Sequence, residues 1–332
     1  MPSFRRATVT EIISERPGLQ RVGTDLGRAY VLTQLTGTVA VGDRVVLNTT
    51  AVDLGLGTGG WHVVHWNLAR ESWSEPGPGH IIKLRDTSLQ ADTGAGEEHH
   101  PDVPDSLDGT PVVVCTVHSQ VPCVVVAALA ARPAARIAYV MTDGAALPLA
   151  FSELTATMVE RGLLVGTVTA GHAFGGDLEA VNVHSALTLA RHVLDADLIV
   201  VGMGPGVVGT GSKLGTTSLE AVGALDAVAA LGGRPVACLR VSDGDPRDRH
   251  QGVSHHTRTV LDLVRSPVLV ADTPTLGPLD RHQVVEVDPP DTAALLAAEG
   301  LHVTTMGRTP DEDPAYFAAA GQAGVLGARL TR

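Results

Sequence analysis

The chain has 332 residues, more than the roughly 100–200 residues of one typical domain, which favours two domains. Hydrophobic residues make up 44% and charged residues 18%, a composition typical of globular proteins that excludes the disordered and collagen-like classes. The net charge is −12, no basic stripe is present, and aromatic residues are only 3%. Nucleic acid is therefore not expected as a partner, because its phosphates would be repelled and few rings could stack on its bases.

The spacing of the cysteines and the length of the apolar runs indicate in which cellular compartment the protein lies. Cys115, Cys123 and Cys238 show no C-x-x-C spacing, and two of them lie inside apolar runs, as buried thiols do in a reducing environment. Residues 1–6 lack the apolar stretch of a signal peptide, and the longest apolar run, residues 121–131, falls short of the roughly 18 residues that cross a bilayer. We expect a cytoplasmic protein without a membrane segment. Whether it forms a homo-oligomer is left open.

The first part of the chain has the pattern of short strands separated by turns. We expect these strands to close into a small β-barrel whose core is filled by tryptophans. The strands are expected at residues 7–14, 29–35 and 45–50, and the tryptophans are Trp61, Trp66 and Trp73.

Two segments are expected to connect this β-domain, residues 1–90, to the rest of the chain. Residues 80–90 carry Lys83 and Arg85, spaced to lie on one face of a strand, and are predicted to fold back onto the second domain. Residues 91–109 are acidic and rich in proline and glycine, which is typical of a linker. The second domain then covers residues 110–332.

In this second domain, apolar runs rich in valine, isoleucine and leucine alternate with helical stretches. Strands of continuous apolar residues are buried on both faces, so the sequence predicts a doubly wound, mostly parallel α/β domain. Strands are expected at residues 112–117, 136–141, 163–168, 198–201, 235–241, 268–271, 284–287 and 301–304, and helices at 124–131, 153–161 and 218–231.

Polar residues follow the expected strands where each one ends. In open parallel sheets, ligands bind outside the carboxyl ends of the strands, because loops and helix N-termini meet there. The sequence therefore predicts one cleft at this edge. The residues expected to converge in it are His118, Asp143, His172, Gly204 and Ser242.

The loop after the fourth strand, residues 202–215, is rich in glycine. Gly204, Gly206 and Gly209 form a G-x-G-x-x-G, but the next helix starts only near Thr217, and Asp243 comes too late for a dinucleotide fingerprint. A phosphate loop does not fit either, because serine precedes Lys213. What remains is a glycine-rich loop before a capping box at residues 217–220, where a helix N-terminus would stabilise an anion.

Histidines at this edge suggest either proton transfer or metal binding. Imidazole titrates near neutral pH, and His172, His118 and His255 are the expected general acids and bases. His172 is flanked by glycines that let a ligand approach the backbone. A metal could be held by His172 and Asp177 with His184, or by His250, His255 and His256, although the adjacent pair His255 and His256 is expected to point to different sides of a helix. Ser119 is interpreted as a helix cap, because no G-x-S-x-G surrounds it.

These observations favour an enzyme that acts on a small anionic metabolite, phosphorylated or carboxylated, by histidine acid–base chemistry. The same loops also fit a non-catalytic protein that binds a metabolite or nucleotide, or a scaffold whose β-domain binds another protein. No cofactor is specified. The residues expected to hold the anion are Gly204, Gly206, Gly209, Gly211, Lys213, Ser119, Asp143 and Ser242.

Four segments resemble a family of bacterial proteins known as domain of unknown function 3866. They are residues 80–90 (HIIKLRDTSLQ), 118–120 (HSQ), 171–182 (GHAFGGDLEAVN) and 202–206 (GMGPG). The resemblance covers the whole chain and departs from the family pattern at Asp86 and Ser88, where an aromatic residue and a proline are expected. It implies no activity, so the expectations above rest on the residues themselves.

Overall fold

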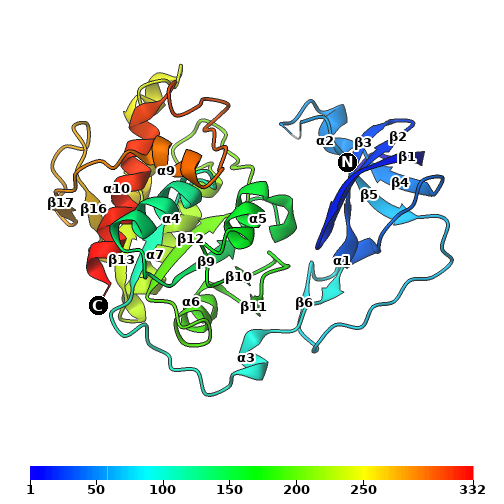
Figure 1. The fold of residues 1–332 in the computed structure, drawn as a ribbon, viewed down its shortest axis with the longest axis horizontal. Helices are drawn as coiled ribbons and strands as arrows, with labels where there is room; N and C mark the ends of the chain where they lie inside the picture. Colours follow the sequence, from blue (N-terminus) through cyan, green and yellow to red (C-terminus); the bar gives the residue numbers. More distant parts are fainter. Residues whose placement is uncertain (58, 332) are drawn as a thin grey trace. The chain divides into compact units, whose positions relative to one another are not determined.

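The structure is a computed structural model that describes residues 1–57 and 59–331. The chain divides into two compact units, Met1–Gly94 and Ala95–Arg332, each drawn in Figure 1 and each described here by itself. The division falls inside the segment 91–109. Residues 95–109 belong to the second unit, where Leu107 is fully buried and the short helix α3 (Gly96–His99) packs beside the sheet edge.

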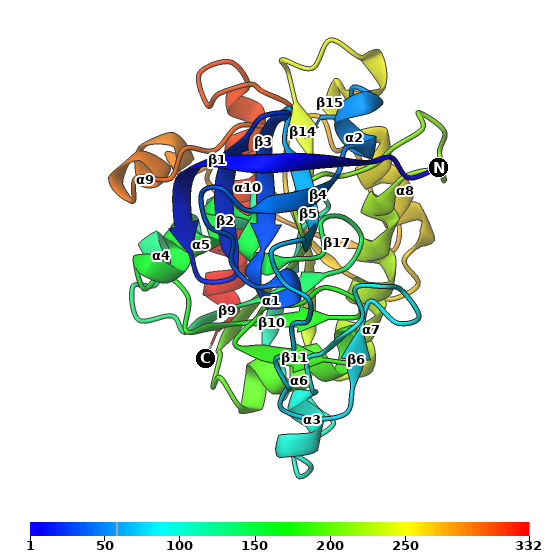
Figure 2. The same cartoon turned by 90° about the vertical axis from the view of Figure 1, so that its right-hand side faces the viewer.

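The first unit is a closed barrel with the strand order β1-β2-β3-β5-β4, which confirms the small β-barrel expected from the sequence. In Figure 2 its curved strands are seen from another side. The strands are β1 (Phe4–Arg16), β2 (Leu19–Thr24), β3 (Gly27–Leu32), β4 (Arg44–Asn48) and β5 (His62–Asn67), with the one-turn helices α1 (Thr33–Thr36) and α2 (Thr50–Asp53) between them. Alternate residues point inward, as Val45 and Leu47 do on β4.

The barrel core consists of small aliphatic side chains, so the expectation that tryptophans fill it is wrong. Trp61, Trp66 and Trp73 are each only half-buried. Trp61 instead stacks on Tyr30, with the ring centroids 4.6 Å apart, and the Arg28 guanidinium lies over its ring. A narrow barrel has room inside for valine and alanine but not for indole rings. The core residues are Ala7, Val9, Val22, Ala29, Val31, Val39, Val45, Leu47 and Val64.

Residues 80–90 lie in the first unit and form less strand than expected. β6 (Ile82–Lys83) pairs antiparallel with β7 (Ala91–Asp92), and then Leu84 and Asp86 adopt positive φ angles of 53° and 58°. These left-handed residues interrupt the extended alternation that would place Lys83 and Arg85 on one strand face. Docking of this segment onto the second domain stays a prediction.

The second unit is built on an eight-stranded parallel sheet with the order β11-β10-β9-β12-β8-β13-β16-β17, which confirms the α/β class. The strands are β8 (Pro111–Val114), β9 (Ile137–Thr142), β10 (Gly166–Ala170), β11 (Leu178–Ala180), β12 (Leu198–Met203), β13 (Arg234–Ala237), β16 (Leu269–Ala271) and β17 (Gln283–Val285).

Three strand predictions are corrected. The strand expected at residues 301–304 is absent from this described segment, the one expected at 235–241 ends at Ala237, and β11 was not foreseen. Beyond Ala237, the chain turns to form β14 (Val241–Ser242), which pairs with β15 (Gly252–Val253) outside the main sheet. The sequence of β11 gives little strand signal, because its three residues include a glutamate and follow a loop rather than a helix.

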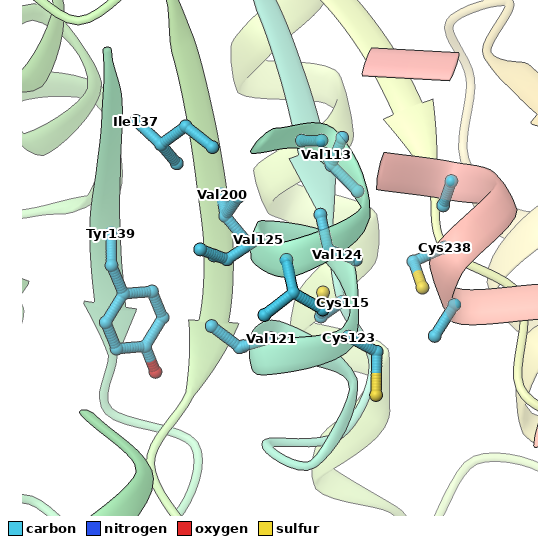
Figure 3. Close-up of a cluster of buried hydrophobic side chains, with 14 of the residues drawn as sticks. Val113, Cys115, Val121, Cys123, Val124, Val125, Ile137, Tyr139, Val200 and Cys238 are labelled. Atoms are coloured by element: carbon cyan, nitrogen blue, oxygen red, sulfur yellow. The ribbon is translucent and has the colours of Figure 1, made fainter. Parts of the chain in front are cut away.

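Successive residues of each strand are buried under opposite layers of helices. On β8, Val113 packs into a core with helices α4 (Gln120–Ala131), α5 (Glu153–Glu160), α9 (Thr292–Ala298) and α10 (Pro314–Leu330), part of which Figure 3 shows. Its neighbour Val112 packs into the opposite core with α6 (Val183–His192), α7 (Glu220–Ala230) and α8 (His255–Leu263). Burial on both faces explains the continuous apolar strand sequences.

Helix α10 packs closely along α4, and glycine makes this approach feasible. A Cβ on Gly324 would collide with the backbone carbonyl of Val124, so no other residue fits there without moving one helix. The packing fixes the N-terminal end of α10. Asp313 and Tyr316 are thereby brought beside the loops that follow β13 and β8.

Candidate functional site

The crossover connections of the sheet separate at its carboxyl edge. After β8 the chain passes to the face with α4, whereas after its neighbours β12 and β13 it passes to the opposite face with α7 and α8. Adjacent loops that leave in opposite directions form the switch-point crevice in which open α/β sheets bind ligands. The carboxyl ends of β12, β8 and β13 therefore flank a switch point of the sheet.

The loop after β8 is held by its own polar side chains. His118 is buried, with its Nδ1 3.0 Å from the Met203 carbonyl and its Nε2 2.7 Å from the Ser152 hydroxyl. A carbonyl can only accept, so Nδ1 carries the proton and Nε2 accepts from Ser152. Burial lowers the pKa of His118 to about 4, against the opposing effect of the Met203 carbonyl. Both ring nitrogens of this expected acid–base residue are thus engaged by the scaffold.

Gln120 and Ser119 are also bonded within the fold. The Gln120 side-chain oxygen accepts from the backbone of Thr116 and Val117, and its amide donates to the Leu239 carbonyl. Ser119 occupies the N-cap position of α4 but makes no capping bond with its side chain, so its interpretation as a cap is wrong. Its hydroxyl instead bonds the Tyr316 hydroxyl at 2.6 Å. The Ser119 hydroxyl is thus bonded to a residue distant in sequence and not to the first turn of α4.

The loops after β9 and β10 bring Asp143 and His172 together. The Asp143 carboxylate accepts the backbone N–H of His172 at 2.9 Å, and Gly171 before it has a positive φ of 67°. A side chain on Gly144 would collide with the Glu220 carboxylate, which lies against this loop. Burial, together with the Asp143 charge, raises the pKa of Glu220, although hydrogen bonds such as that from Thr142 oppose the shift. One Glu220 oxygen has no hydrogen-bond partner among the described residues.

This position of Glu220 corrects the capping box expected at residues 217–220. The N-cap of the 3₁₀ turn η2 (Thr217–Leu219) is Thr216, whose hydroxyl accepts from the Ser218 N–H, and α7 begins at Glu220. Thr217 instead accepts the Val208 N–H with its hydroxyl. The glutamate side chain is consequently available to the carboxyl edge of the sheet.

The glycine-rich loop, residues 202–215, runs between two groups of charged side chains. Near its start, a side chain on Gly204 would collide with the Ala146 carbonyl, and the Ala146 N–H donates to Pro205. Further along, a Cβ on Gly209 would lie 3.4 Å from the His256 ring, and one on Gly211 would lie 3.8 Å from the Arg249 guanidinium. Gly206 and Gly211 have positive φ angles of 101° and 84°.

Lys213, expected to hold an anion, projects from the tip of this loop. Its Nζ lies 3.0 Å from a carboxylate oxygen of Asp262 on α8, and both side chains are about 60% exposed. An exposed ion pair of this kind is weak and easily exchanged. The partner of Lys213 is thus Asp262 on α8, and not Asp143, His172 or Ser242.

Ser242 lies in a buried network of carboxylates and arginines. Its hydroxyl donates to Asp313 at 2.6 Å and accepts the Asp245 N–H. Asp245 pairs with Arg247 at 2.7 Å, and with Arg308 and Arg240 at 3.3 and 3.4 Å. The hydrogen bonds from Arg247 hold the pKa of Asp245 well below its usual range. The network saturates Ser242, which belongs to this group rather than to that of Asp143 and His172.

Three histidines gather beside this network, at the start of α8. The ligand nitrogens of His250, His255 and His256 lie within 4.8 Å of one another. His255 and His256 were expected on different sides of the helix, but their ring centroids are only 4.1 Å apart. The correction follows from their place in the first turn, where side chains lean back past the helix end and no preceding turn separates them.

Two of these rings have buried nitrogens without a hydrogen-bond partner in the described part of the chain: Nε2 of His255 and both nitrogens of His256. Burial is the main cause of the low pKa of His256, about 4, and nearby positive charges such as Arg240 add to it. Burial likewise lowers the pKa of His250 to about 3. These imidazoles are therefore neutral near pH 7.

The other metal candidates, His172 and Asp177, are separated by the length of β10. Asp177 accepts the N–H and hydroxyl of Thr167, near the start of that strand, while His172 follows its end. Four residues of extended chain span roughly 13 Å. The loop after β10 turns back along the sheet to begin β11, which carries Asp177 away from the carboxyl edge.

Several residues of these groups were not foreseen. Arg308 and Asp313 reach the edge from the segment before α10, more than 60 residues from their partners Asp245 and Ser242. Glu220 carried a usable signal, since it is an acidic residue in the capping segment that follows the glycine-rich loop. Arg240 also carried one, as a charged residue at the end of an apolar run.

Comparison with known proteins identifies the family. The model of a family described as "Protein of unknown function (DUF3866)" matches residues 28–324, so the chain belongs to it, as the resemblance of its motifs implied. Neither the curated proteins nor the solved structures include a match.

Within residues 1–57 and 59–331, every helix is too short or too polar to cross a lipid bilayer.

Proposed function

We propose that the protein is an enzyme that binds a small anionic metabolite, phosphorylated or carboxylated, against its glycine-rich loop and transfers a proton through His172. One observation carries the proposal. At its start, the loop residue Met203 lies against Gly144, which contacts the Glu220 carboxylate and follows Asp143. Further along, Gly209 lies beside the His256 ring and Gly211 beside the Arg249 guanidinium. A ligand along the loop would meet an anion-binding end and a proton-transfer end.

The anion-binding end is formed by Gly209, Gly211 and Arg249. Arg249 is exposed, and its charge adds to the effect of burial in lowering the pKa of His255. A guanidinium can bind phosphate or carboxylate oxygens through two parallel hydrogen bonds. Glycines at 209 and 211 leave the backbone N–H groups accessible to an anion.

The proton-transfer end is formed by His172, Asp143 and Glu220. Asp143 fixes the backbone of His172 through the bond to its N–H. Burial raises the pKa of Glu220, and a carboxyl whose pKa is raised is suited to exchange a proton with a bound ligand. His118 is not part of this chemistry in our proposal, because both its nitrogens are occupied.

Binding is tested with pyrophosphate on chelator-treated protein by isothermal titration calorimetry. We expect Arg249→Gln to weaken binding about 10- to 100-fold, the loss associated with a hydrogen bond to a charged group. Arg161→Gln is the matched control, because Arg161 is also exposed but lies at the end of α5. Equal affinities of the two variants would refute the anion-binding end.

Catalysis is tested by incubating the protein with mixtures of phosphorylated and carboxylated metabolites and following products by phosphorus and proton NMR. A metabolite should be converted by the wild type and by His302→Ala, whose exposed histidine lies outside the site. His172→Ala should not convert it. Binding of a metabolite without conversion by the wild type would instead support a non-catalytic binding protein.

A further inference from the structure

The segment 250–256 holds three imidazoles in an arrangement that hydrogen bonding does not explain. The ring centroid of His250 lies 5.0 Å from that of His255 and 5.1 Å from that of His256. The centroids of His255 and His256 are 4.1 Å apart. All three side chains come from the short stretch that joins η3 (Asp248–His250), β15 and the N-terminus of α8. The cluster is therefore positioned by local backbone and lies at the carboxyl edge of the sheet.

Two of the three rings, those of His250 and His256, are buried, and the cluster contains polar atoms that the fold leaves unpaired. His250 is 1% exposed and His256 is 6% exposed, and neither nitrogen of His256 has a hydrogen-bond partner within the described ranges. A buried polar atom left unpaired costs about 1–3 kcal/mol. Unpaired nitrogens on two rings, His255 and His256, that lie against each other and against His250 are retained at that cost only if something else binds their lone pairs.

We propose that His250, His255 and His256 form a binding site for a divalent first-row transition-metal ion, of which Zn²⁺ fits the three imidazole ligands best. Imidazole nitrogens bind Zn²⁺ at about 2.0–2.1 Å, which places tetrahedral ligand atoms roughly 3.4 Å apart. The nitrogens here lie within 4.8 Å of one another, so the rings need to close by about an ångström. The metal would pair Nε2 of His255 and one of the two nitrogens of His256.

Ser254 positions the first of these ligands. Its Oγ lies 2.8 Å from Nδ1 of His250 and also accepts the His256 N–H at 3.3 Å. With Nδ1–H donating to Ser254, Nε2 of His250 is free of its proton and able to bind the metal. An outer hydrogen bond of this kind fixes the tautomer of a metal-binding histidine.

The charges around the cluster indicate what completes the coordination. Arg240, Arg247 and Arg249 contribute positive potential there, of which Asp245 neutralises a part by pairing with the first two. Three neutral imidazoles add no negative charge. The fourth ligand is therefore an anion, such as hydroxide, phosphate or carboxylate; this fourth position rests on the proposed function, whereas the three-histidine site does not.

The test uses the full-length protein with any affinity tag removed, stripped with a chelator and then titrated with Zn²⁺ and Co²⁺. We expect about one metal ion per chain by mass spectrometry of the metal content, and the visible absorption of tetrahedral Co²⁺ on three nitrogen ligands. His256→Ala and His255→Ala should lose both signals, and His302→Ala should keep them. Stoichiometric binding that persists in both cluster variants, or no binding by the wild type, would overturn the proposal.

A second pair of variants separates ligand loss from misfolding. Ser254→Ala should weaken Zn²⁺ binding about 10- to 100-fold, and Ser254→Thr, which keeps the hydroxyl, should restore it. Equal Zn²⁺ affinities of Ser254→Ala and the wild type would refute the positioning of His250. Because pyrophosphate binding is measured on stripped protein, loss of the metal site leaves the anion-binding test intact, and failure of either proposal is seen separately.

Discussion

The loops after β8 and β13 lie side by side at the same edge of the sheet but use their polar residues differently. After β8, both nitrogens of His118 and the whole amide of Gln120 are bonded to the scaffold. After β13, the rings of His255 and His256 keep nitrogens without partners in the described chain. Position at the carboxyl edge therefore does not by itself distinguish a structural residue from a candidate for binding. The number of its hydrogen bonds that the fold already makes is the sharper criterion.

The loop after β13 also contains polar groups whose hydrogen bonds are all made within the fold. Asp245 and Asp313 are fully buried, and each accepts hydrogen bonds from arginine side chains and from backbone N–H groups. This network fixes the backbone from which the histidine cluster projects. The comparison thus predicts large losses of stability at saturated groups and small ones at exposed pairs.

The largest loss is expected for Asp245→Ala. The substitution leaves Arg240, which is 3% exposed, buried without its carboxylate partner, and breaking a buried ion pair from one side costs about 3–5 kcal/mol. Urea denaturation measures the free energy of unfolding. Asp248→Ala, an exposed aspartate three residues away, is the control and should cost less than about 1 kcal/mol. Similar values for the two variants would contradict the structural role of the network.

A smaller, pH-dependent loss is expected from His118. Its pKa of about 4 in the folded protein lies below the ordinary value of 6.5, so the unfolded chain binds a proton first as the pH falls. The stability that neutral His118 contributes is complete above about pH 6.5 and declines between pH 6.5 and 4. By linkage this decline is about 2 kcal/mol between pH 7.5 and 5.

The measurement compares urea unfolding of the wild type and His118→Gln at pH 7.5 and at pH 5. Because His250 and His256 titrate as well, only the difference between the two proteins reports on His118. The wild type should lose about 2 kcal/mol more than His118→Gln on acidification. His302→Gln should behave like the wild type. Parallel losses in all three proteins would show that His118 is not held neutral by burial.

The fold could be predicted from the sequence because its signals are local. Valine-rich runs buried on both faces identify a parallel sheet, and alternation in residues 1–67 identifies the barrel. The errors arose where tertiary contacts override local pattern. Trp61 stacks on Tyr30 at the barrel surface, and Ser119 bonds Tyr316 from α10 instead of capping α4.

The groups at the carboxyl edge were only partly predictable for the same reason. That loops ending in histidine, serine and aspartate share one edge follows from parallel topology. Which of them remain unsaturated depends on residues that arrive from elsewhere, such as Ser152 for His118 and Asp313 for Ser242. The proximity of His255 and His256 depends on their place in the first helical turn, which the sequence alone did not fix within one residue.

The smallest effect on stability is expected for Lys213→Ala, which removes an exposed ion pair and not a buried one. The ion pair with Asp262 spans 3.0 Å, but its side chains are 63% and 61% exposed, so water and salt screen it. Its loss should cost under about 1 kcal/mol of unfolding free energy, and a double-mutant cycle with Asp262→Ala should give a coupling energy that vanishes at 1 M salt.

Because Lys213 projects from the tip of the loop, the pyrophosphate affinity of stripped Lys213→Ala should fall less than that of Arg249→Gln. A larger fall in Lys213→Ala than in Arg249→Gln would move the anion-binding end from Gly211 to the loop tip, and with it the position of any metabolite relative to His172.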